Sequence, residues 1–196
     1  MRRAADILRE GGVIVYPTDS CYALGCHPGD KSALERMRAI RQVDERHHFA
    51  LVCRDLAEAA GYARFDNRQF RVLKAATPGS YTFILKAGRG VPKRLQHPKR
   101  RTIGLRIPDH PVVHALLAEL GEPVLSSTLL LPGEKVPLDD AHEIRARLEH
   151  AVDLILDCGS CGITPTTVMD LTGETPVILR AGKGSLAAFG VEAAPR

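Results

Sequence analysis

Tryptophan is missing from this sequence of 196 residues, and aromatic residues make up only 5% of it. Proteins that bind single-stranded nucleic acid by stacking bases on rings need more aromatic side chains than this. Long apolar runs are also missing, because no stretch approaches the roughly 18 residues that a membrane-spanning helix requires. The N-terminus is basic at Arg2 and Arg3, but Asp6 and Arg9 interrupt any signal-peptide core. These absences argue against a membrane association and lead us to expect a cytoplasmic protein.

Cysteine is scarce and odd in number, with five in the chain, which argues against a disulfide framework. Cys158 and Cys161 have C-x-x-C spacing, but the residues that follow look like a loop rather than the helix start of a redox motif. No second ligand pair completes a zinc site around them. We therefore expect a structural or incidental role for both thiols, with redox sensitivity as the alternative. His110 and His114, four apart on a predicted helix, could hold a metal, but an exposed helical face is the commoner arrangement.

Length and composition describe an ordinary globular chain. Its residues are 44% hydrophobic and 26% charged, and 196 residues suit one domain with a core of its own. We predict that residues 1–185 form this domain and that residues 186–196 form a short C-terminal tail.

Short apolar runs alternate with amphipathic segments along the chain, a pattern that predicts alternating strands and helices. We predict strands at residues 13–16, 49–53, 81–85, 102–107, 123–126, 152–156, 167–171 and 177–179. We predict helices at residues 4–10, 31–41, 56–60, 67–74, 111–120 and 141–150, with Asp55 and Asp109 as caps. Because single helices do not separate every pair of strands, this order predicts an α/β fold with a mixed sheet covered by helices.

Charge is segregated along the sequence, although the formal net charge is only +4. Residues 86–106 carry eight Lys and Arg and no acid, whereas residues 134–157 carry seven acids and three basic side chains. A positive face of this kind attracts phosphates, and a solvated basic loop is the alternative. The candidate nucleic-acid contacts in this basic run are Lys93, Lys99, Arg100 and Arg101.

Standard phosphate-binding loops are absent, since the sequence has neither a Walker A motif nor G-x-G-x-x-G after a strand. Hydroxyl side chains and arginines recur instead at strand ends. The segments concerned are 17–20, 102–106, 126–128 and 166–170 followed by Arg180. Guanidinium groups bind carboxylate and phosphate oxygens in bidentate fashion. Their recurrence in one α/β chain therefore indicates an anion-binding site at the sheet.

Five segments resemble the YrdC/YciO family, in the right order and over nearly the whole chain. They are residues 12–25 (GVIVYPTDSCYALG), 78–85 (PGSYTFIL), 102–108 (TIGLRIP), 165–171 (PTTVMDL) and 180–182 (RAG). Two further stretches, residues 40–56 and 129–133, are similar to the YciO branch in particular.

The resemblance implies a single twisted α/β domain with a mixed, largely open sheet and a basic concave cavity. It implies synthesis of threonylcarbamoyl-adenylate from L-threonine, bicarbonate and ATP with magnesium, for a transfer-RNA adenosine modification, or a divergent activity on that adenylate. By motif position, the expected threonine contacts are Thr18, Arg106, Ser126 and Thr166. The expected nucleotide contacts are Arg41, Thr102, Thr128 and Arg180. No catalytic side chain and no metal site made by the protein alone is expected.

Two departures from the family pattern concern the triphosphate. Synthases usually carry a K-x-R pair of basic residues after the second helix. Here Arg41 keeps the first positive charge, and Val43 stands in place of the second basic residue. They also carry S-x-N at the end of a later strand, and here Leu130 stands where Asn belongs. Missing donors of this kind weaken the stabilisation of a leaving pyrophosphate. Arg46, His47 or His48 could replace the missing donors. Because of the two departures, we expect binding of the adenylate rather than ATP-driven synthesis.

A second class of function stays open at this point. Some family members were described as binders of double-stranded RNA, and the basic run would suit transfer RNA or duplex RNA. In that case the protein would bind nucleic acid without a catalytic activity of its own.

Overall fold

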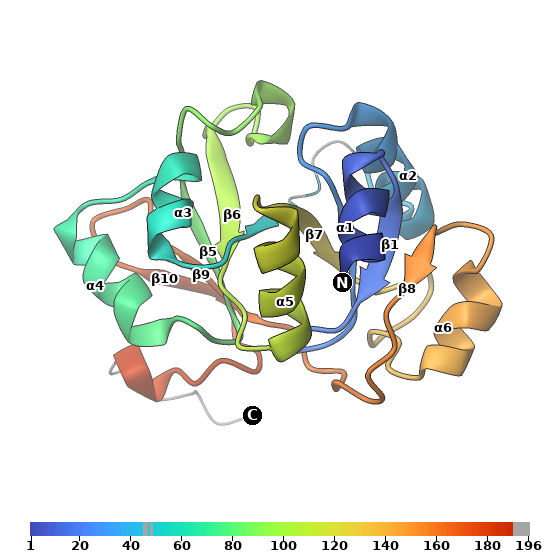
Figure 1. Cartoon of the computed structure of the whole chain (residues 1–196). Helices are drawn as coiled ribbons and strands as arrows, with labels where there is room; N and C mark the ends of the chain where they lie inside the picture. The colour runs from blue at the N-terminus through green and yellow to red at the C-terminus, as the bar shows by residue number, and fades with distance from the viewer. Residues whose placement is uncertain (45–46, 48, 190–196) are drawn as a thin grey trace.

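The computed structural model describes residues 1–44, 47 and 49–189, and within them one sheet of ten strands carries six α-helices (Figure 1). The helices are α1 (Arg2–Arg9), α2 (Lys31–Arg41), α3 (Leu56–Tyr62), α4 (Asn67–Ala76), α5 (Pro111–Leu120) and α6 (Ala141–Leu148). The strands are β1 (Val13–Tyr16), β2 (Ala23–Cys26), β3 (Ala50–Val52), β4 (Ala63–Arg64), β5 (Tyr81–Ala87), β6 (Thr102–Arg106), β7 (Val124–Thr128), β8 (Leu154–Ile155), β9 (Thr167–Asp170) and β10 (Val177–Arg180). Two short 3-10 turns are η1 (Lys93–Leu95) and η2 (Ala187–Phe189).

The sheet is mixed, as the order of elements predicts. Its strands follow the order β10-β9-β5-β6-β3-β7-β2-β1-β8, and β4 pairs with β5 beside this path. The pairs β1–β8, β3–β6 and β5–β9 are parallel, and the other described pairs are antiparallel. The predicted fold class is thus confirmed.

Two described strands are not predicted by the sequence pattern, the two-residue β4 (Ala63–Arg64) and β2 (Ala23–Cys26). In β2 the cause can be identified. Its third residue is Gly25, which weakens the strand signal in a run of only four residues. A Cβ at this position would lie 2.8 Å from the Tyr16 ring and 2.9 Å from a Val124 methyl. Glycine is therefore required here, because β1, β2 and β7 could not otherwise pack so closely.

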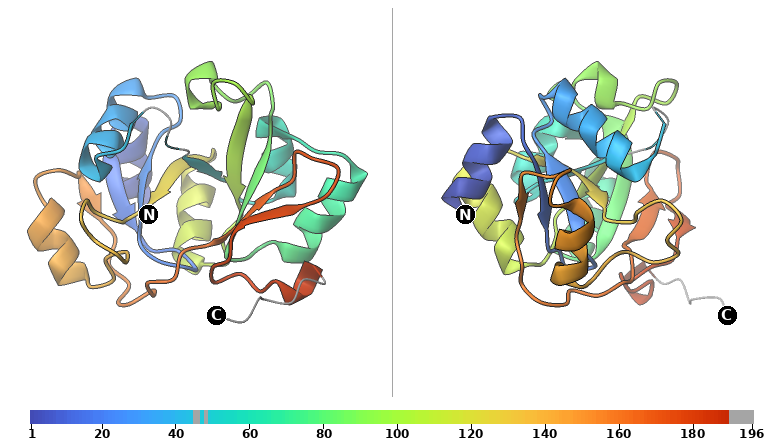
Figure 2. Two further views of the ribbon diagram at one scale, coloured as in Figure 1. Left: turned by 180° about the vertical axis from the view of Figure 1, so that it is seen from behind. Right: turned by 90° about the vertical axis from the view of Figure 1, so that its right-hand side faces the viewer.

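Alternation of side chains along the strands divides the core into two layers. On one face, Ile14, Val52 and Val124 pack under α1 and α5, which lie side by side (Figure 1). On the opposite face, a larger cluster holds the buried side chains of α2, α3, α4 and α6. Because the sheet twists, strands β5, β6, β9 and β10 lie without a described helix over them in the view from behind (Figure 2).

One row of paired residues crosses seven strands on the face that α1 and α5 cover at one end. This cross-strand row consists of Ile14, Gly25, Ser126, Ala50, Gly104, Ile84 and Asp170. Side chains of neighbouring paired residues point to the same face of a sheet. The row therefore runs from the apolar layer under the two helices to the uncovered part of the sheet.

The helix caps agree with the sequence at one predicted position and differ at the other. Asp55 accepts a hydrogen bond from Glu58 N at 2.8 Å and caps α3, which confirms that prediction. The prediction that Asp109 caps α5 is wrong, because His110 occupies the N-cap and Pro111 the first helical position. The backbone N–H of Asp109 instead donates to Asp19 Oδ2 at 3.1 Å. Asp109 thus lies one residue too early to accept from the helix.

Residues near the C-terminus pack on the sheet. The ring of Phe189 lies edge-on to Tyr81 with centroids 5.7 Å apart, and the Tyr81 hydroxyl donates to the Ser185 carbonyl at 2.8 Å. Part of the predicted tail, the turn η2, thus contacts the domain, while residues 190–196 lie outside the described residues.

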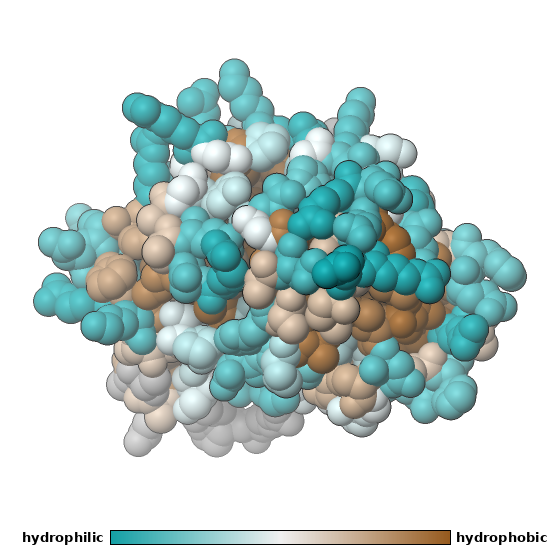
Figure 3. Space-filling view, in the orientation of Figure 1, coloured by the Kyte–Doolittle hydropathy of each residue, from teal (hydrophilic) through white to brown (hydrophobic). Residues whose placement is uncertain are grey.

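The molecular surface over α1 and α5 is mostly hydrophilic, with apolar patches between charged side chains (Figure 3). No helix in the described part of the chain has the length and apolar character needed to cross a bilayer.

Candidate functional site

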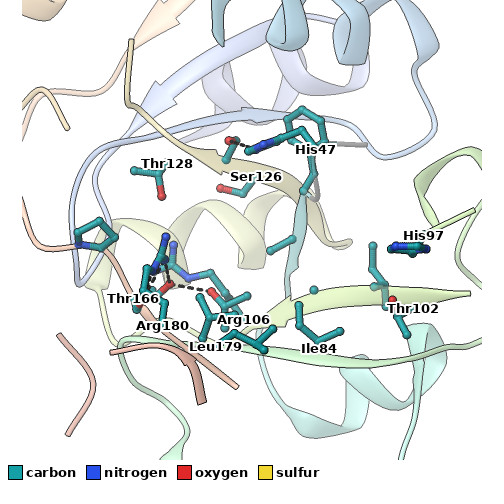
Figure 4. Close-up of a pocket in the computed structure, with 18 of the residues that line it drawn as sticks. His47, Ile84, His97, Thr102, Arg106, Ser126, Thr128, Thr166, Leu179 and Arg180 are labelled. Atoms are coloured by element: carbon teal, nitrogen blue, oxygen red, sulfur yellow. Dashed lines mark hydrogen bonds between the residues drawn. The ribbon is translucent and has the colours of Figure 1, made fainter. Parts of the chain in front are cut away.

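A cavity of about 340 Å³ lies against the uncovered part of the sheet (Figure 4). Alternate residues of β6 and β7 supply much of its wall, because residues two apart on a strand share a face. The cavity is lined by residues from α2, η1, the strands β3, β5, β6, β7, β9 and β10, and the segments beside them.

Seven of the eight predicted small-molecule contacts line this cavity. They are Arg41, Thr102, Arg106, Ser126, Thr128, Thr166 and Arg180. Sequence positions as distant as 41 and 180 are therefore brought together by the fold. The eighth predicted contact, Thr18, is not among the lining residues.

Arg106 is the most enclosed cation of the site. Its Nη2 atom donates to Asp19 Oδ1 at 2.8 Å, and 5% of the Arg106 side chain and 7% of that of Asp19 are exposed. The same nitrogen lies 3.2 Å from the Ser20 hydroxyl and 3.4 Å from that of Thr18. The buried Nε atom has no acceptor among the described residues. Arg106 is thus held firmly on one side and keeps an unused donor.

Thr18 lies behind Arg106 rather than at the cavity wall. Its hydroxyl donates to the Cys21 carbonyl at 2.7 Å and lies 3.1 Å from the Ser20 hydroxyl. The backbone N–H of Ser20 donates to it at 3.2 Å. In this structure Thr18 closes the turn that positions Arg106, and its direct contact with threonine stays a prediction.

Arg41 enters the cavity from the C-terminal end of α2. Its Nη1 atom donates to the Ser127 hydroxyl at 2.6 Å and to the carbonyl of Thr128. Burial lowers the pKa of Arg41 from its ordinary value, and its Nε atom has no acceptor among the described residues. The hydroxyl of Ser127 also lies 3.4 Å from His47 Nε2.

Arg180 reaches the cavity from the end of β10. Its Nε and Nη2 atoms donate to the Thr166 carbonyl at 3.1 and 2.9 Å, and Nη2 lies 3.2 Å from the Thr166 hydroxyl. Burial lowers the pKa of Arg180 as well, and the charge of Arg106 adds to that effect. Figure 4 shows Arg106, Arg180 and Thr166 gathered at one end of the cavity and Thr102 at the other.

The cavity is positive because its arginines outnumber nearby acids. None of the described lining residues is Asp or Glu. Asp19 offsets Arg106, and Asp170 pairs with Arg100 at 3.3 Å, but the described partners of Arg41 and Arg180 are neutral oxygens. Arginines whose described partners are neutral oxygens favour an anionic ligand, since each of them can form a charge-assisted hydrogen bond with it.

Hydroxyl groups of the site are held by the hydroxyls of the buried Tyr16 and the half-buried Thr82. Ser126 accepts a hydrogen bond from Tyr16 at 2.7 Å, and Thr166 lies 2.8 Å from Thr82. Burial raises the pKa of Tyr16 to about 12, so its hydroxyl stays protonated and donating. These contacts orient Ser126 and Thr166 before any ligand arrives.

Several lining or supporting residues are not predicted from the sequence. Asp19 holds Arg106, Ser127 holds Arg41, and His97 lies near Thr102 at the far end of the cavity. The Nδ1 atom of His97 accepts the backbone N–H groups of Lys99 and Arg100, both at 3.1 Å. Asp19 and Ser127 lie in strand-end segments that the sequence singles out, 17–20 and 126–128, but their roles in holding arginines are not predicted; His97 has no such signal.

The two departures from the family pattern differ in where they lie. Val43 packs against the main apolar cluster and is not a lining residue, whereas Leu130 lines the cavity. His47 also lines it, while Arg46 and His48 lie outside the described residues. An apolar side chain thus stands at the cavity wall, at the position where the family resemblance leads us to expect an amide.

The basic run lines a second, more open hollow that shares His97 and Arg100 with the cavity. This basic groove is lined by Arg64, Lys86, Arg89, Lys93, Arg100 and Arg101, with Asp66 as its described acid. Of the four predicted nucleic-acid contacts, Lys93, Arg100 and Arg101 line it and Lys99 does not.

The cysteines and histidines singled out by spacing do not gather into a metal centre within the described residues. Cys158 and Cys161 are free thiols, the first exposed and the second half-buried. His114 Nε2 lies 2.8 Å from the Pro108 carbonyl.

Comparisons with known proteins agree with this geometry. Residues 6–182 match the Sua5/YciO/YrdC family model, described as "Telomere recombination". An uncharacterized protein of Haemophilus influenzae is 56% identical over 190 residues, which cover 96% of this chain and 92% of that protein. YciO of Escherichia coli K12 is 53% identical over 189 residues, with the same coverage. A threonylcarbamoyl-AMP synthase of Chromohalobacter salexigens is 32% identical over 174 residues, covering 88% of this chain and 93% of the synthase.

Two solved structures are similar to most of this chain. The crystal structure of E. coli YciO matches with a TM-score of 0.92 at 53% identity, over 96% of this chain and 91% of that one. P. abyssi Sua5 complexed with L-threonine matches with a TM-score of 0.84 at 26% identity, over 92% of this chain and 53% of Sua5. Fold and sequence agree: the chain belongs to the Sua5/YciO/YrdC family, and it is more similar to YciO of E. coli than to the synthase or to Sua5.

Proposed function

We propose that the cavity binds an adenylate derived from threonine, and that the protein is an enzyme of the threonylcarbamoyl-AMP synthase type or acts on that adenylate. One observation carries the proposal: Arg41, Arg106 and Arg180, here called the guanidinium trio, line a cavity without a described acid. Arg106 is buried, Arg41 is half-buried and Arg180 is exposed at the cavity rim. Two of the three keep a buried Nε–H without a described acceptor. A ligand with a carboxylate and a phosphate would satisfy these donors.

The relatives support this chemistry. Proteins named threonylcarbamoyl-AMP synthase share 30% to 36% of their residues with this chain, and a Sua5 structure of similar fold holds L-threonine. The substrates we propose are accordingly L-threonine, bicarbonate and ATP or its adenylate.

Catalysis in such a site rests on positioning and charge neutralisation. The threonine amine attacks the carbon of bicarbonate and water leaves, which gives a carbamate; a carbamate oxygen then attacks the α-phosphorus of ATP while pyrophosphate leaves. The guanidinium trio would hold the carboxylate and the phosphoryl oxygens in line and offset the charge that develops. Within the described residues, no group of three His, Cys, Asp or Glu could hold a metal ion, so magnesium would be carried by the ATP phosphates.

The apolar side chain of Leu130 in the cavity wall favours binding of the adenylate over binding of the triphosphate. Leu130 offers no donor to a departing pyrophosphate, and Val43 packs against the core instead of supplying a second cation. We therefore propose that the adenylate is bound well and that release of pyrophosphate from ATP is slow.

Isothermal titration calorimetry tests the proposal directly. The wild type should bind AMP and a non-hydrolysable threonylcarbamoyl-adenylate analogue. Arg106→Ala should weaken the analogue by about tenfold or more, because a charge-assisted contact is lost. Arg9→Ala, which removes an arginine far from the cavity, is the matched control. A wild type that binds neither ligand would refute the proposal.

The basic groove supports a second candidate, the binding of duplex or transfer RNA. It brings six Lys and Arg together against one described acid, Asp66. With few aromatic side chains available, such a surface would contact phosphates and helical shape rather than stacked bases.

Filter binding of a transfer RNA at low and moderate salt tests this candidate. Changing Lys86, Arg89 and Lys93 together to Gln, all outside the cavity wall, should lower the salt slope by about 3 if each contacts a phosphate. The exposed Lys135, Arg145 and Arg147, changed the same way, form the control. An absence of RNA affinity even at low salt would leave the adenylate as the ligand of this protein.

A further inference from the structure

The loop after β8 carries two thiols that the proposed chemistry does not use. Cys158 is exposed and Cys161 is half-buried, and both are free. The backbone between them bends at Gly159, whose φ of +77° lies in the left-handed region that favours glycine. Burial raises the pKa of Cys161 to about 12, and the charges of Asp139 and Cys158 add to that effect. The two sulfurs therefore lie near each other in residues 157–162, here called the thiol loop.

The thiol loop is held at two points in this reduced form. The Tyr22 hydroxyl donates to the Gly159 carbonyl at 2.8 Å and accepts the backbone N–H of Cys158 at 3.2 Å. Asp139 Oδ1 accepts the backbone N–H of Cys161 at 2.7 Å and that of the next residue at 2.8 Å. The Cys158 sulfur lies 4.0 Å from the Tyr22 hydroxyl oxygen. A bond between the two sulfurs therefore requires a rearrangement of this loop.

The thiol loop packs on the turn that supports Arg106. A Cβ on Gly162 would lie 3.2 Å from the Ser20 carbonyl oxygen, so the loop backbone lies directly against that residue. The Thr18 backbone forms a hydrogen bond with the Cys161 sulfur. The hydroxyls of Ser20 and Thr18 lie 3.2 and 3.4 Å from Arg106 Nη2. A continuous set of contacts thus joins Cys161 to the most enclosed cation of the cavity.

The chain after the thiol loop enters the cavity itself. Pro165 and Thr166, which follow Cys161 by only a few residues, are lining residues. The Thr166 carbonyl accepts a hydrogen bond from Arg180 Nη2 at 2.9 Å. A movement at Cys161 is therefore transmitted to the site both through space and along the backbone.

We propose that Cys158 and Cys161 form a reversible disulfide with hydrogen peroxide as the oxidant, and that this bridge weakens ligand binding at Arg106. The exposed Cys158 thiol attacks the peroxide O–O bond and becomes a sulfenic acid, and water leaves. The Cys161 sulfur then attacks the Cys158 sulfur, the S–O bond breaks, and a second water leaves with the Cys161 proton. One peroxide thus takes two electrons from the two thiols. The effect at Arg106 rests on the proposed function, whereas the bridge does not.

The direction of the effect follows from where the two partners of Cys161 lie. Thr18 is buried and Cys158 is at the surface. Because sulfurs in a disulfide are only about 2 Å apart, a Cys161 sulfur that turns toward Cys158 turns away from the Thr18 backbone. The turn at residues 17–20 then loses part of its support, and Arg106 is oriented less firmly for a carboxylate.

Peptide mass spectrometry after treatment with hydrogen peroxide tests the bridge. The peptide that contains residues 158–161 should lose the mass of two hydrogen atoms, and dithiothreitol should restore that mass. Cys158→Ser should show no such loss. The absence of a bridge in the wild type, or a bridge from Cys161 to the buried Cys21, would overturn the proposed pairing.

Hydrogen exchange tests the coupling to the turn without any ligand. The backbone N–H of Ser20 donates to the Thr18 hydroxyl at 3.2 Å, which protects it in the reduced protein. The peptide covering residues 17–22 should therefore exchange faster in the bridged protein than in the reduced one. Equal exchange in the two forms would show that the bridge leaves the turn intact and would overturn the coupling.

Calorimetry with L-threonine tests the effect at Arg106. Peroxide should weaken binding by the wild type about threefold or more, the loss expected for one hydrogen bond, and dithiothreitol should reverse it. Cys158→Ser should bind equally before and after peroxide, which controls for oxidation of methionine, because dithiothreitol does not reduce methionine sulfoxide. Unchanged affinity in the bridged wild type would overturn the effect at Arg106. A reduced wild type that does not bind L-threonine would count against the proposed function, while mass and exchange still decide the bridge and its coupling.

Discussion

The two ends of the cross-strand row differ in what covers them. Ile14 is buried under α1 and α5, whereas Ser126, Ala50, Gly104 and Ile84 line the cavity. Strand β7 crosses the boundary, since Val124 belongs to the apolar cluster and Ser126, two residues later on the same face, belongs to the site. A change from apolar to hydroxyl side chains within one face of a strand thus marks where helix cover ends and ligand binding begins.

The difference has a physical cause in the twist of the sheet. Helices α1 and α5 cover one end of this face, and the other end turns to the rear without a described helix over it. Apolar side chains left uncovered there would be exposed to water at a cost. Arginine and hydroxyl groups avoid that cost and, once supported by Asp19 and Tyr16, are positioned for an anion.

The largest expected effect on stability comes from placing a hydroxyl on the part of the sheet face that α1 and α5 cover. Val124→Ser removes a buried side chain packed beneath α5 and strands a hydroxyl among apolar groups, which should cost about 2–4 kcal/mol of unfolding free energy. Urea unfolding measures it. Affinity for AMP in the folded fraction should not change. The exposed Val136→Ser is the control, and an equal loss there would contradict the comparison.

The reciprocal change acts at the uncovered end. Ser126→Ala leaves the buried Tyr16 hydroxyl without its acceptor and should cost about 1–3 kcal/mol of unfolding free energy, together with ligand affinity. Adding Tyr16→Phe removes the stranded hydroxyl, so part of the stability should return while the affinity does not. If the two losses of stability simply add in the double variant, the hydrogen bond is not what links these residues.

Much of this arrangement is predictable from the sequence, and the reasons are local. Strands such as residues 13–16 and 81–85 are found because their apolar runs are flanked by turn residues, and Pro111 correctly indicates the start of α5. Thr102 and Arg106 are predicted as ligand contacts because residues 102–108 resemble a motif of the family, and in the structure both lie on one face of β6. Seven of eight small-molecule contacts then meet at the cavity.

The remaining features depend on packing across distant strands. Strand β2 is not predicted because it contains Gly25. The glycine is required by its contacts with the Tyr16 ring and with Val124, which are distant in the sequence. The role of Asp19 depends on the pairing that brings Arg106 to it. The place of Thr18 behind Arg106 is likewise a property of the turn as folded, and no pattern of residue types distinguishes a contact with ligand from a contact with its neighbour.

A third prediction concerns the two positions that depart from the family pattern, Leu130 and Val43. Leu130→Asn with Val43→Arg should raise pyrophosphate release from ATP, in the presence of threonine, bicarbonate and magnesium, by about tenfold or more, because donors at a leaving group lower the barrier. A coupled pyrophosphate assay measures the rate. Leu130→Asn alone is the variant that leaves the core at Val43 intact. Rapid release by the wild type would show that other residues already meet this need.

The smallest expected effect is on the pH dependence of stability, and it comes from His110. This residue is the N-cap of α5 and lies near Asp19, the partner of Arg106. Burial lowers the pKa of His110 below its ordinary value of 6.5, which outweighs the opposite effect of Asp19. The folded protein therefore binds fewer protons at His110 than the unfolded chain does at pH values between the two pKa values, so stability rises with pH there.

The contribution of His110 to the free energy of unfolding is fully present at pH values above its ordinary pKa. It is lost as the pH falls toward the lowered pKa of the folded state. His110→Gln should accordingly flatten the dependence of the urea midpoint on pH between about pH 5 and pH 7.5. His142→Gln, on the exposed face of α6, controls for the loss of an imidazole. If wild type and His110→Gln lose stability equally on acidification, the cap of α5 carries no such proton linkage, and the pH response of the covered end must come from other groups.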